Sequence, residues 1–153
     1  MLEPGSPAPR LVLEDTEGNP VRLTGHAALV YFARSTTCPV CARHVRDLAE
    51  HRERFETAGV RVYIAVPEDR VTAAAWRAKR GIPFPVLTSP EGTPHEVVGL
   101  TRKVFGSMQQ SGSVLVDARG VVRHAHGATL PTASYDRDGI FAALESAVHQ
   151  KSA

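Results

Sequence analysis

The chain has little of several features that mark specialised protein classes. Only two of its 153 residues are cysteines, and 6% are aromatic. No stretch approaches the roughly 18 consecutive apolar residues of a membrane-spanning helix. Charge of one sign is also lacking, because 18 Lys and Arg residues are balanced by 16 Asp and Glu residues, a net charge of +2. These absences exclude a disulfide-rich scaffold, a strongly basic nucleic-acid-binding protein, an acidic solvating chain and a chain with a membrane-spanning helix.

The composition is that of an ordinary globular protein, with 42% hydrophobic and 22% charged residues. A chain of this length buries about two-thirds of the surface that its unfolded form exposes, so we expect a single domain over residues 1–153. The first ten residues contain Pro4, Pro7 and Pro9 and lack the apolar core of a signal peptide. We therefore expect a cytoplasmic protein, in a reducing compartment where paired cysteines are usually catalytic or bind metal.

The hydrophobic pattern predicts an α/β architecture. Extended segments are expected at residues 11–13, 21–23, 28–33, 60–66, 84–87, 113–117 and 121–126. Helices are expected at residues 41–58, 70–80, 96–100 and 136–149. The first two extended segments form a hairpin around a turn-rich sequence from Asp15 to Pro20. Alternation of strand and helix, followed by a hairpin and a last helix, predicts a mixed β-sheet flanked by helices, with parallel strands around Val30 and Val66.

The two cysteines form the motif Cys38-Pro39-Val40-Cys41, between an apolar strand and an amphipathic helix. Proline suits the first helical position, where a missing N–H costs nothing, so we expect Cys38 at the N-cap and Cys41 two residues after Pro39. Both sulfurs then lie near unpaired backbone N–H groups and the positive end of the helix dipole. That environment is predicted to stabilise a thiolate and to lower the pKa of a cysteine.

Two other interpretations of the cysteine pair stay open. The cysteines can be buried structural thiols. Together with His44 they also have the C-x2-C-x2-H spacing of metal ligands, but no second Cys and His pair supplies a fourth ligand. A redox-active dithiol needs only the two cysteines in this local context. We therefore prefer a redox dithiol and expect neither a metal nor another cofactor.

The chain resembles the peroxiredoxin-like branch of the thioredoxin superfamily, known as the alkyl hydroperoxide reductase/thiol-specific antioxidant family. The similarity covers nearly the whole sequence, and the N-terminal hairpin favours this branch over a minimal thioredoxin. The matching segments are residues 5–9, 15–23, 29–32, 38–41, 55, 59–62 and 112–120. The resemblance implies a thioredoxin-like fold with an N-terminal β-hairpin extension, and a thiol-dependent oxidoreductase with antioxidant activity.

The resemblance also implies a role for each cysteine. Peroxiredoxins carry the pattern P-x-x-x-(T/S)-x-x-C, in which the cysteine is peroxidatic. The register that also aligns Phe55 and the strand after Gly59 makes Cys41 peroxidatic and places Cys38 at the Thr/Ser position. A competing register makes Cys38 peroxidatic with Ser35 as its Thr/Ser partner, and it needs a short insertion in the helix.

The sequence departs from the family at two positions. Arg34 or Tyr31, depending on the register, stands at the family's proline, and the family's catalytic arginine falls near Ser111. We therefore expect neighbouring side chains to support the cysteines: a guanidinium to stabilise a departing alkoxide, and a histidine one turn after Cys41 to tune its pKa. The supporting candidates are Arg34, Ser35, Thr37, Arg43 and His44.

The resemblance implies that the pair reduces peroxides through a dithiol–disulfide cycle. Cys41 becomes a sulfenic acid, Cys38 condenses with it, and an external dithiol such as a thioredoxin reduces the disulfide. A thioredoxin-like disulfide reductase would instead use Cys38 to attack a substrate disulfide and Cys41 to resolve it. A catalytically inactive thioredoxin-fold binding module is the third alternative. We expect a peroxide or disulfide substrate, no nucleic-acid or membrane partner, and a monomer or homodimer.

Overall fold

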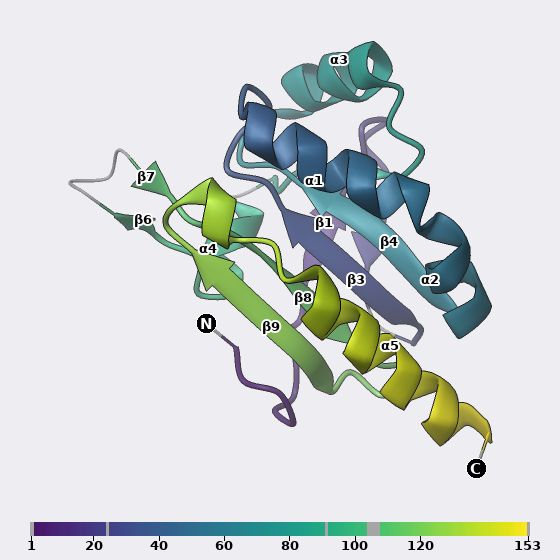
Figure 1. Cartoon of the computed structure of the whole chain (residues 1–153). Helices are drawn as coiled ribbons and strands as arrows, with labels where there is room; N and C mark the ends of the chain where they lie inside the picture. The colour runs from purple at the N-terminus through teal and green to yellow at the C-terminus, as the bar shows by residue number, and fades with distance from the viewer. Residues whose placement is uncertain (1, 24, 91, 104–107, 153) are drawn as a thin grey trace.

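A five-stranded mixed sheet forms the centre of the molecule (Figure 1). The computed structural model describes residues 2–23, 25–90, 92–103 and 108–152. The strands lie in the order β5-β4-β3-β8-β9, with bounds Val86–Leu87, Val60–Ala65, Ala27–Phe32, Ser111–Val116 and Val122–Ala128. Strand β3 runs parallel to β4 and antiparallel to β8. The predicted mixed sheet and the predicted parallel pair are therefore confirmed.

Four helices cover one face of this sheet, and in Figure 1 α1, α2 and α5 lie in front of the strands. They are α1 (Pro39–Glu50), α2 (Arg52–Ala58), α3 (Arg70–Arg80) and α5 (Arg137–Ser152). Helix α3 has its predicted bounds because Asp69 caps its first turn and Gly81, at φ 62°, ends it in the left-handed region. The apolar stripes of the helices pack on Leu29, Ile64 and Leu115 of the strands.

The helix predicted over residues 41–58 is two helices, and the break lies at His51. His51 has non-helical dihedrals of φ −105° and ψ 16°. Its ring Nδ1 lies 2.8 Å from the carbonyl oxygen of Asp47, which also accepts the backbone N–H of His51 at 3.2 Å, so α1 ends with both groups of His51 on this carbonyl. The prediction of one helix was therefore wrong at this residue, while its end at Gly59 is confirmed.

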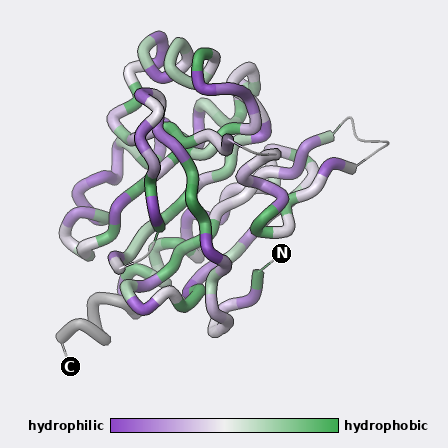
Figure 2. The backbone as a smooth tube through the Cα atoms, turned by 180° about the vertical axis from the view of Figure 1, so that it is seen from behind, coloured by the Kyte–Doolittle hydropathy of each residue, from purple (hydrophilic) through white to green (hydrophobic). Residues whose placement is uncertain are grey.

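The predicted N-terminal hairpin covers the opposite face of the sheet. Strands β1 (Val12–Glu14) and β2 (Pro20–Arg22) pair antiparallel, and the Asp15 carboxylate accepts backbone N–H groups within the turn. Reciprocal backbone bonds between Glu14 and Thr88 attach the hairpin beside the end of β5. The short helix α4 (Pro94–Val97) precedes Val98 and Leu100, which complete this second apolar cluster. Viewed from behind, hydrophobic stretches run along the central strands (Figure 2).

Short elements differ most from the sequence prediction. Helix α4 ends at Val97, whereas the predicted helix covered 96–100. Strands β6 (Arg102–Lys103) and β7 (Met108–Gln109) and a 3-10 turn at Pro131–Ala133 were not predicted. Elements of two to four residues are too short to show a hydrophobic period. The side chain of Val148, predicted on the apolar face of the last helix, lies outside the described residues.

Replacing Gly112 with alanine should destabilise the sheet. A Cβ atom at this position would overlap the carbonyl oxygen of His126 on β9, which is backbone and cannot move aside cheaply. We expect Gly112→Ala to lower the free energy of unfolding by about 1–3 kcal/mol, as overpacking does. Urea unfolding measures the loss. Ser113→Ala is the matched control on the same strand, because the Ser113 hydroxyl is buried without a partner and its removal should cost nothing. Equal stability of both variants would contradict the prediction.

Candidate active site

The two cysteines lie at the start of α1, after the loop of residues 33–37 that follows β3. Cys38 is the N-cap with φ −80° and ψ 110°, and Pro39 occupies the first turn. The Sγ atom of Cys38 accepts a hydrogen bond from the backbone N–H of Cys41 at 3.2 Å. Both cysteines are free thiols. The predicted capping arrangement is therefore present, with one thiol at the helix end and the other in its first turn.

The two sulfurs differ in burial and in their partners. Cys38 is 5% exposed, whereas Cys41 is fully buried at 0%. The Sγ atom of Cys41 accepts the backbone N–H of Arg34 at 3.4 Å, and both this bond and the Tyr31 side chain lower the pKa of Cys41. Burial first, and then the interaction with the Cys38 side chain, raise the pKa of Cys41 to about 11. The predicted lowering of a cysteine pKa is therefore wrong for Cys41, since burial outweighs its favourable hydrogen bonds.

One peptide group links Cys41 to the opposite face of the sheet. The peptide between Ala33 and Arg34 donates its N–H to the Cys41 sulfur and accepts at its carbonyl oxygen from His95 Nε2 at 2.7 Å. His95 is fully buried, and its Nδ1 has no hydrogen-bond partner. Burial lowers the pKa of His95 to about 4, so the ring is neutral at physiological pH with its proton on Nε2. His95 thus fixes the orientation of the amide that binds Cys41.

The two candidate arginines do not bring a guanidinium to the sulfurs. Arg34 Nη2 lies 3.7 Å from the Sδ atom of Met108. Arg43 is exposed, and its charge acts on His44. In the described parts of the chain, neither guanidinium donates a hydrogen bond to Cys38 or Cys41. Only the backbone of Arg34 reaches the site.

The loop before Cys38 is held by a carboxylate that was not predicted. The hydroxyls of Ser35 and Thr37 lie 3.0 Å apart and bond to each other. Between them, Thr36 donates its backbone N–H and its hydroxyl to the Glu68 carboxylate at 2.8 and 2.6 Å. The candidates Ser35 and Thr37 therefore shape this loop, and Glu68 ties it to the segment after β4.

His44 lies near Cys41, as predicted, but Tyr31 stands between them. The Tyr31 hydroxyl is 2.7 Å from His44 Nδ1, and the His44 ring stacks on Tyr135 with centroids 4.8 Å apart. Burial and the neighbouring Arg43 charge lower the pKa of His44. Among the described residues, no group of three or more Cys, His, Asp or Glu side chains is placed to hold a metal ion.

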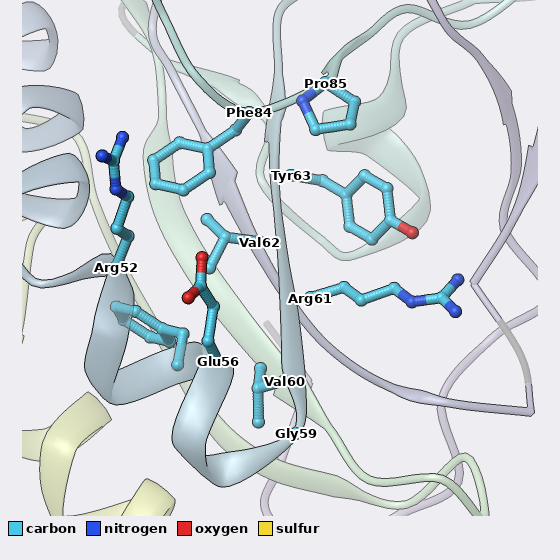
Figure 3. Close-up of a pocket in the computed structure, with 10 residues that line it drawn as sticks. Arg52, Glu56, Gly59, Val60, Arg61, Val62, Tyr63, Phe84 and Pro85 are labelled. Atoms are coloured by element: carbon cyan, nitrogen blue, oxygen red, sulfur yellow. The ribbon is translucent and has the colours of Figure 1, made fainter.

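A cavity of about 470 Å³ lies elsewhere, between α2, β4 and the segment before β5 (Figure 3). Arg61 and Tyr63 point to the opposite side of β4 from Val62 and Phe84, as alternate residues of a strand do. None of the lining residues is a cysteine or a supporting candidate. This cavity is therefore separate from the dithiol.

The sequence of residues 4–125 matches the model of the AhpC/TSA family. The chain belongs to this family. A Mycobacterium tuberculosis protein named as a peroxiredoxin is 30% identical over 125 residues, which cover 80% of this chain and 75% of that protein. A peroxiredoxin-like protein from Aquifex aeolicus has a similar structure, with a TM-score of 0.80 at 15% identity over 95% of this chain and 88% of that one. The bacterioferritin comigratory protein of Xanthomonas campestris has a TM-score of 0.73 at 19% identity, over 90% and 92% of the two chains.

Membership of the AhpC/TSA family confirms the resemblance stated from the sequence, and the structural neighbours confirm the thioredoxin-like fold. The chain is thus a peroxiredoxin-like enzyme of the thioredoxin superfamily. Ser111, near the position expected for the family's arginine, is fully buried and its hydroxyl has no hydrogen-bond partner. Over the described residues, no helix combines the length and apolar character needed to cross a membrane.

Glutamine at position 95 should make stability less dependent on pH. His95 has a folded-state pKa of about 4 and an ordinary value of 6.5. The unfolded chain therefore binds the extra proton first, and stability falls as pH drops from about 6.5 to about 4. Below about pH 4 the free energy of unfolding has fallen by about 3 kcal/mol in total. His95→Gln keeps an N–H donor for the Ala33 carbonyl but cannot titrate. Urea unfolding across this pH range should show a flatter profile for the variant.

The comparison between the two proteins isolates His95 from other histidines. Burial also lowers the pKa of His44 and His124, but both residues are present in both proteins and their contributions cancel. Parallel profiles for the two proteins would show that the buried ring does not set this pH dependence.

Proposed function

We propose that this chain is a thiol peroxidase that cycles Cys38 and Cys41 between the dithiol and the disulfide. The observation that carries the proposal is the placement of two free thiols in the first turn of α1 in a member of the AhpC/TSA family. The solved Xanthomonas campestris protein is described by its alkyl peroxide reduction activity. The chain holds no other cysteine, so the oxidised sulfur is resolved within the pair or by another molecule.

The geometry favours Cys38 as the sulfur that attacks peroxide. Cys38 is at the helix N-cap and accepts a backbone N–H, and although it is also buried, its 5% exposure makes it the less completely covered of the two cysteines. Cys41 is covered, and its pKa is raised. The family register points the other way, since it assigns the peroxidatic role to Cys41. We favour the order given by burial and hydrogen bonding, in which Cys38 attacks and Cys41 resolves.

The cycle has three balanced steps. The Cys38 thiolate attacks the outer peroxide oxygen, the O–O bond breaks, and the departing alkoxide takes up a proton to leave as an alcohol. The Cys41 thiol then attacks the Cys38 sulfenic acid, the S–O bond breaks, and a disulfide and water form. An external dithiol finally reduces the disulfide and becomes a disulfide itself. A thioredoxin is the reductant that we propose, in keeping with a structurally similar yeast mitochondrial peroxiredoxin described with glutathione/thioredoxin systems.

Disulfide reduction is the second candidate function. It is favoured by the same asymmetry, because an outer N-cap thiol in front of a buried thiol also suits attack on a substrate disulfide followed by resolution. The substrate alone separates the two functions. The single-domain organisation, the cytoplasmic location and the monomeric or dimeric state remain predictions.

Serine variants of the two cysteines test the proposal. We expect Cys38→Ser to slow thiol oxidation by peroxide about a hundredfold or more, because the attacking sulfur is lost. Cys41→Ser should still be oxidised once, giving a sulfenic acid that a dimedone probe traps, but it should not turn over with a dithiol reductant. Stopped-flow oxidation and mass spectrometry measure both effects.

Each other pattern has a defined meaning. Loss of the first oxidation in Cys41→Ser, with survival in Cys38→Ser, would give the peroxidatic role to Cys41. An intact protein that peroxide does not oxidise, but that reacts quickly with a disulfide, would be a reductase. An ordinary cysteine pKa near 8.5, with no disulfide under mild oxidation, would support an inactive binding module.

A further inference from the structure

Cys41 is joined to a histidine through a buried tyrosine. The Tyr31 hydroxyl lies 2.7 Å from His44 Nδ1, and Tyr31 belongs to the same buried cluster as Cys41, where its side chain favours the Cys41 thiolate and so lowers the pKa of that thiol. Tyr31 belongs to β3 and is 0% exposed, while Cys41 and His44 lie on the same face of α1, three residues apart. We propose that Tyr31 and His44 form a proton relay that takes the proton from the Cys41 thiol when that sulfur becomes the nucleophile. This inference deepens the proposed function and rests on it for the step that the relay serves.

The need for a relay follows from the burial of Cys41. A thiolate is the nucleophilic form, and a fully buried thiol has no water surface to receive its proton. Apart from Cys38, Tyr31 is the described side chain whose interaction shifts the pKa of the Cys41 thiol. Tyr31 cannot be the final base, because burial and the neighbouring cysteine raise its pKa far above the usual tyrosine value. It can only accept one proton while it passes on another.

His44 has the properties of the acceptor. Its pKa lies below the ordinary histidine value, so the ring is neutral at physiological pH and Nδ1 can accept the Tyr31 hydroxyl proton. Transfer from Cys41 to the Tyr31 oxygen, together with transfer from Tyr31 to Nδ1, gives a thiolate, a neutral tyrosine and an imidazolium. The half-buried His44 ring then exchanges its proton with solvent. Solvent also protonates the hydroxide released from the Cys38 sulfenic acid, so the net product is water.

The groups around His44 hold the ring and set its charge. Tyr135 stacks on the ring at an interplanar angle of 28°, and its hydroxyl donates to Asp47 at 2.7 Å. The Asp47 carboxylate favours the imidazolium, while burial and Arg43 oppose it. Arg137 of α5 binds Asp47 at 3.2 Å, and His51 lies 3.7 Å from the same carboxylate oxygen. Ser134, whose hydroxyl donates to the Pro131 carbonyl at 2.8 Å, lowers the pKa of Tyr31 and completes the polar surroundings of the relay.

The first experiment needs no peroxide. In a Cys38→Ser background the only titrating thiol is Cys41, and ultraviolet absorbance of the thiolate follows its ionisation. Adding Tyr31→Phe removes a hydrogen bond to the ionised sulfur, so the midpoint should rise by about one pH unit, a tenfold loss of thiolate at fixed pH. Tyr63→Phe is the matched control, because Tyr63 is buried on the other face of the sheet, where its hydroxyl lies 3.2 Å from His26. That control should leave the midpoint unchanged.

The second experiment tests His44 as a relay residue. With both cysteines present, one equivalent of peroxide is added and the rate of disulfide formation is measured at each pH. We expect this rate to rise as His44 loses its proton, at pH values below the ordinary histidine pKa. His44→Gln accepts a hydrogen bond from Tyr31 but cannot take its proton, so closure should slow about tenfold and this rising limb should vanish. Closure of a mixed disulfide preformed on Cys38 provides the same readout if peroxide is not the substrate.

The outcomes separate the relay from a structural role and from the proposed function. Thermal unfolding and circular dichroism establish that each variant is folded. An unchanged Cys41 midpoint in folded Tyr31→Phe, or an unchanged pH limb in His44→Gln, would refute the relay whether or not peroxide is reduced. Shifts in both readouts, with no reaction toward peroxide, would keep the relay and overturn the peroxidase.

Discussion

Burial of the Cys41 sulfur is the constraint on which the arrangement of this site depends. A sulfur without exposed surface must find its hydrogen-bond partners inside the protein. The chain leaving β3 provides the Arg34 amide that donates to this sulfur, while Tyr31 of β3 and the N-cap residue Cys38 are the neighbouring side chains that shift its pKa. The site therefore exists only when α1 is docked on the sheet with its first turn over the end of β3.

The same constraint extends through the sheet to the opposite layer. His95 is the second residue of α4 and lies on the face of the sheet that the N-terminal hairpin covers. It nevertheless donates to the Ala33 carbonyl, which belongs to the same peptide group as the N–H that reaches Cys41. A peptide plane is rigid, so fixing its oxygen also fixes the direction of its N–H. Phe32 packs edge-on against the His95 ring, with centroids 5.3 Å apart. Packing on one face of the sheet thus orients a hydrogen bond on the other.

The sequence predicted the parts of this structure that depend on local pattern. The apolar run at residues 28–33 indicated the central strand, and capping residues indicated the bounds of α3. Pro39 placed Cys38 at the N-cap. The helix break at His51 and the two-residue strands leave no hydrophobic periodicity in the sequence. The main elements were therefore predictable, while helix breaks and short pairings depended on individual contacts.

The candidate site was predictable in position but less so in chemistry. Spacing and context located the dithiol and placed His44 nearby. The ionisation of Cys41 was mistaken because it depends on how completely α1 covers the sulfur. Tyr31 offered one signal, a hydroxyl within an otherwise apolar strand. His95 offered none, since it is 62 positions from Ala33 in sequence and only the folded chain brings the two together.

Two sulfurs with the same local motif acquire different chemistry because they occupy different positions in one helical turn. The N-cap position leaves Cys38 at the helix end, where its sulfur accepts one of the backbone N–H groups that have no partner within the helix. The position three residues later turns Cys41 inward, where charge is costly and proton transfer needs a defined route. A guanidinium on the sulfurs would stabilise both thiolates and reduce this difference. In the described structure the Arg34 guanidinium lies against Met108, so the asymmetry between a thiol at the helix N-cap and a fully buried thiol with a raised pKa is maintained.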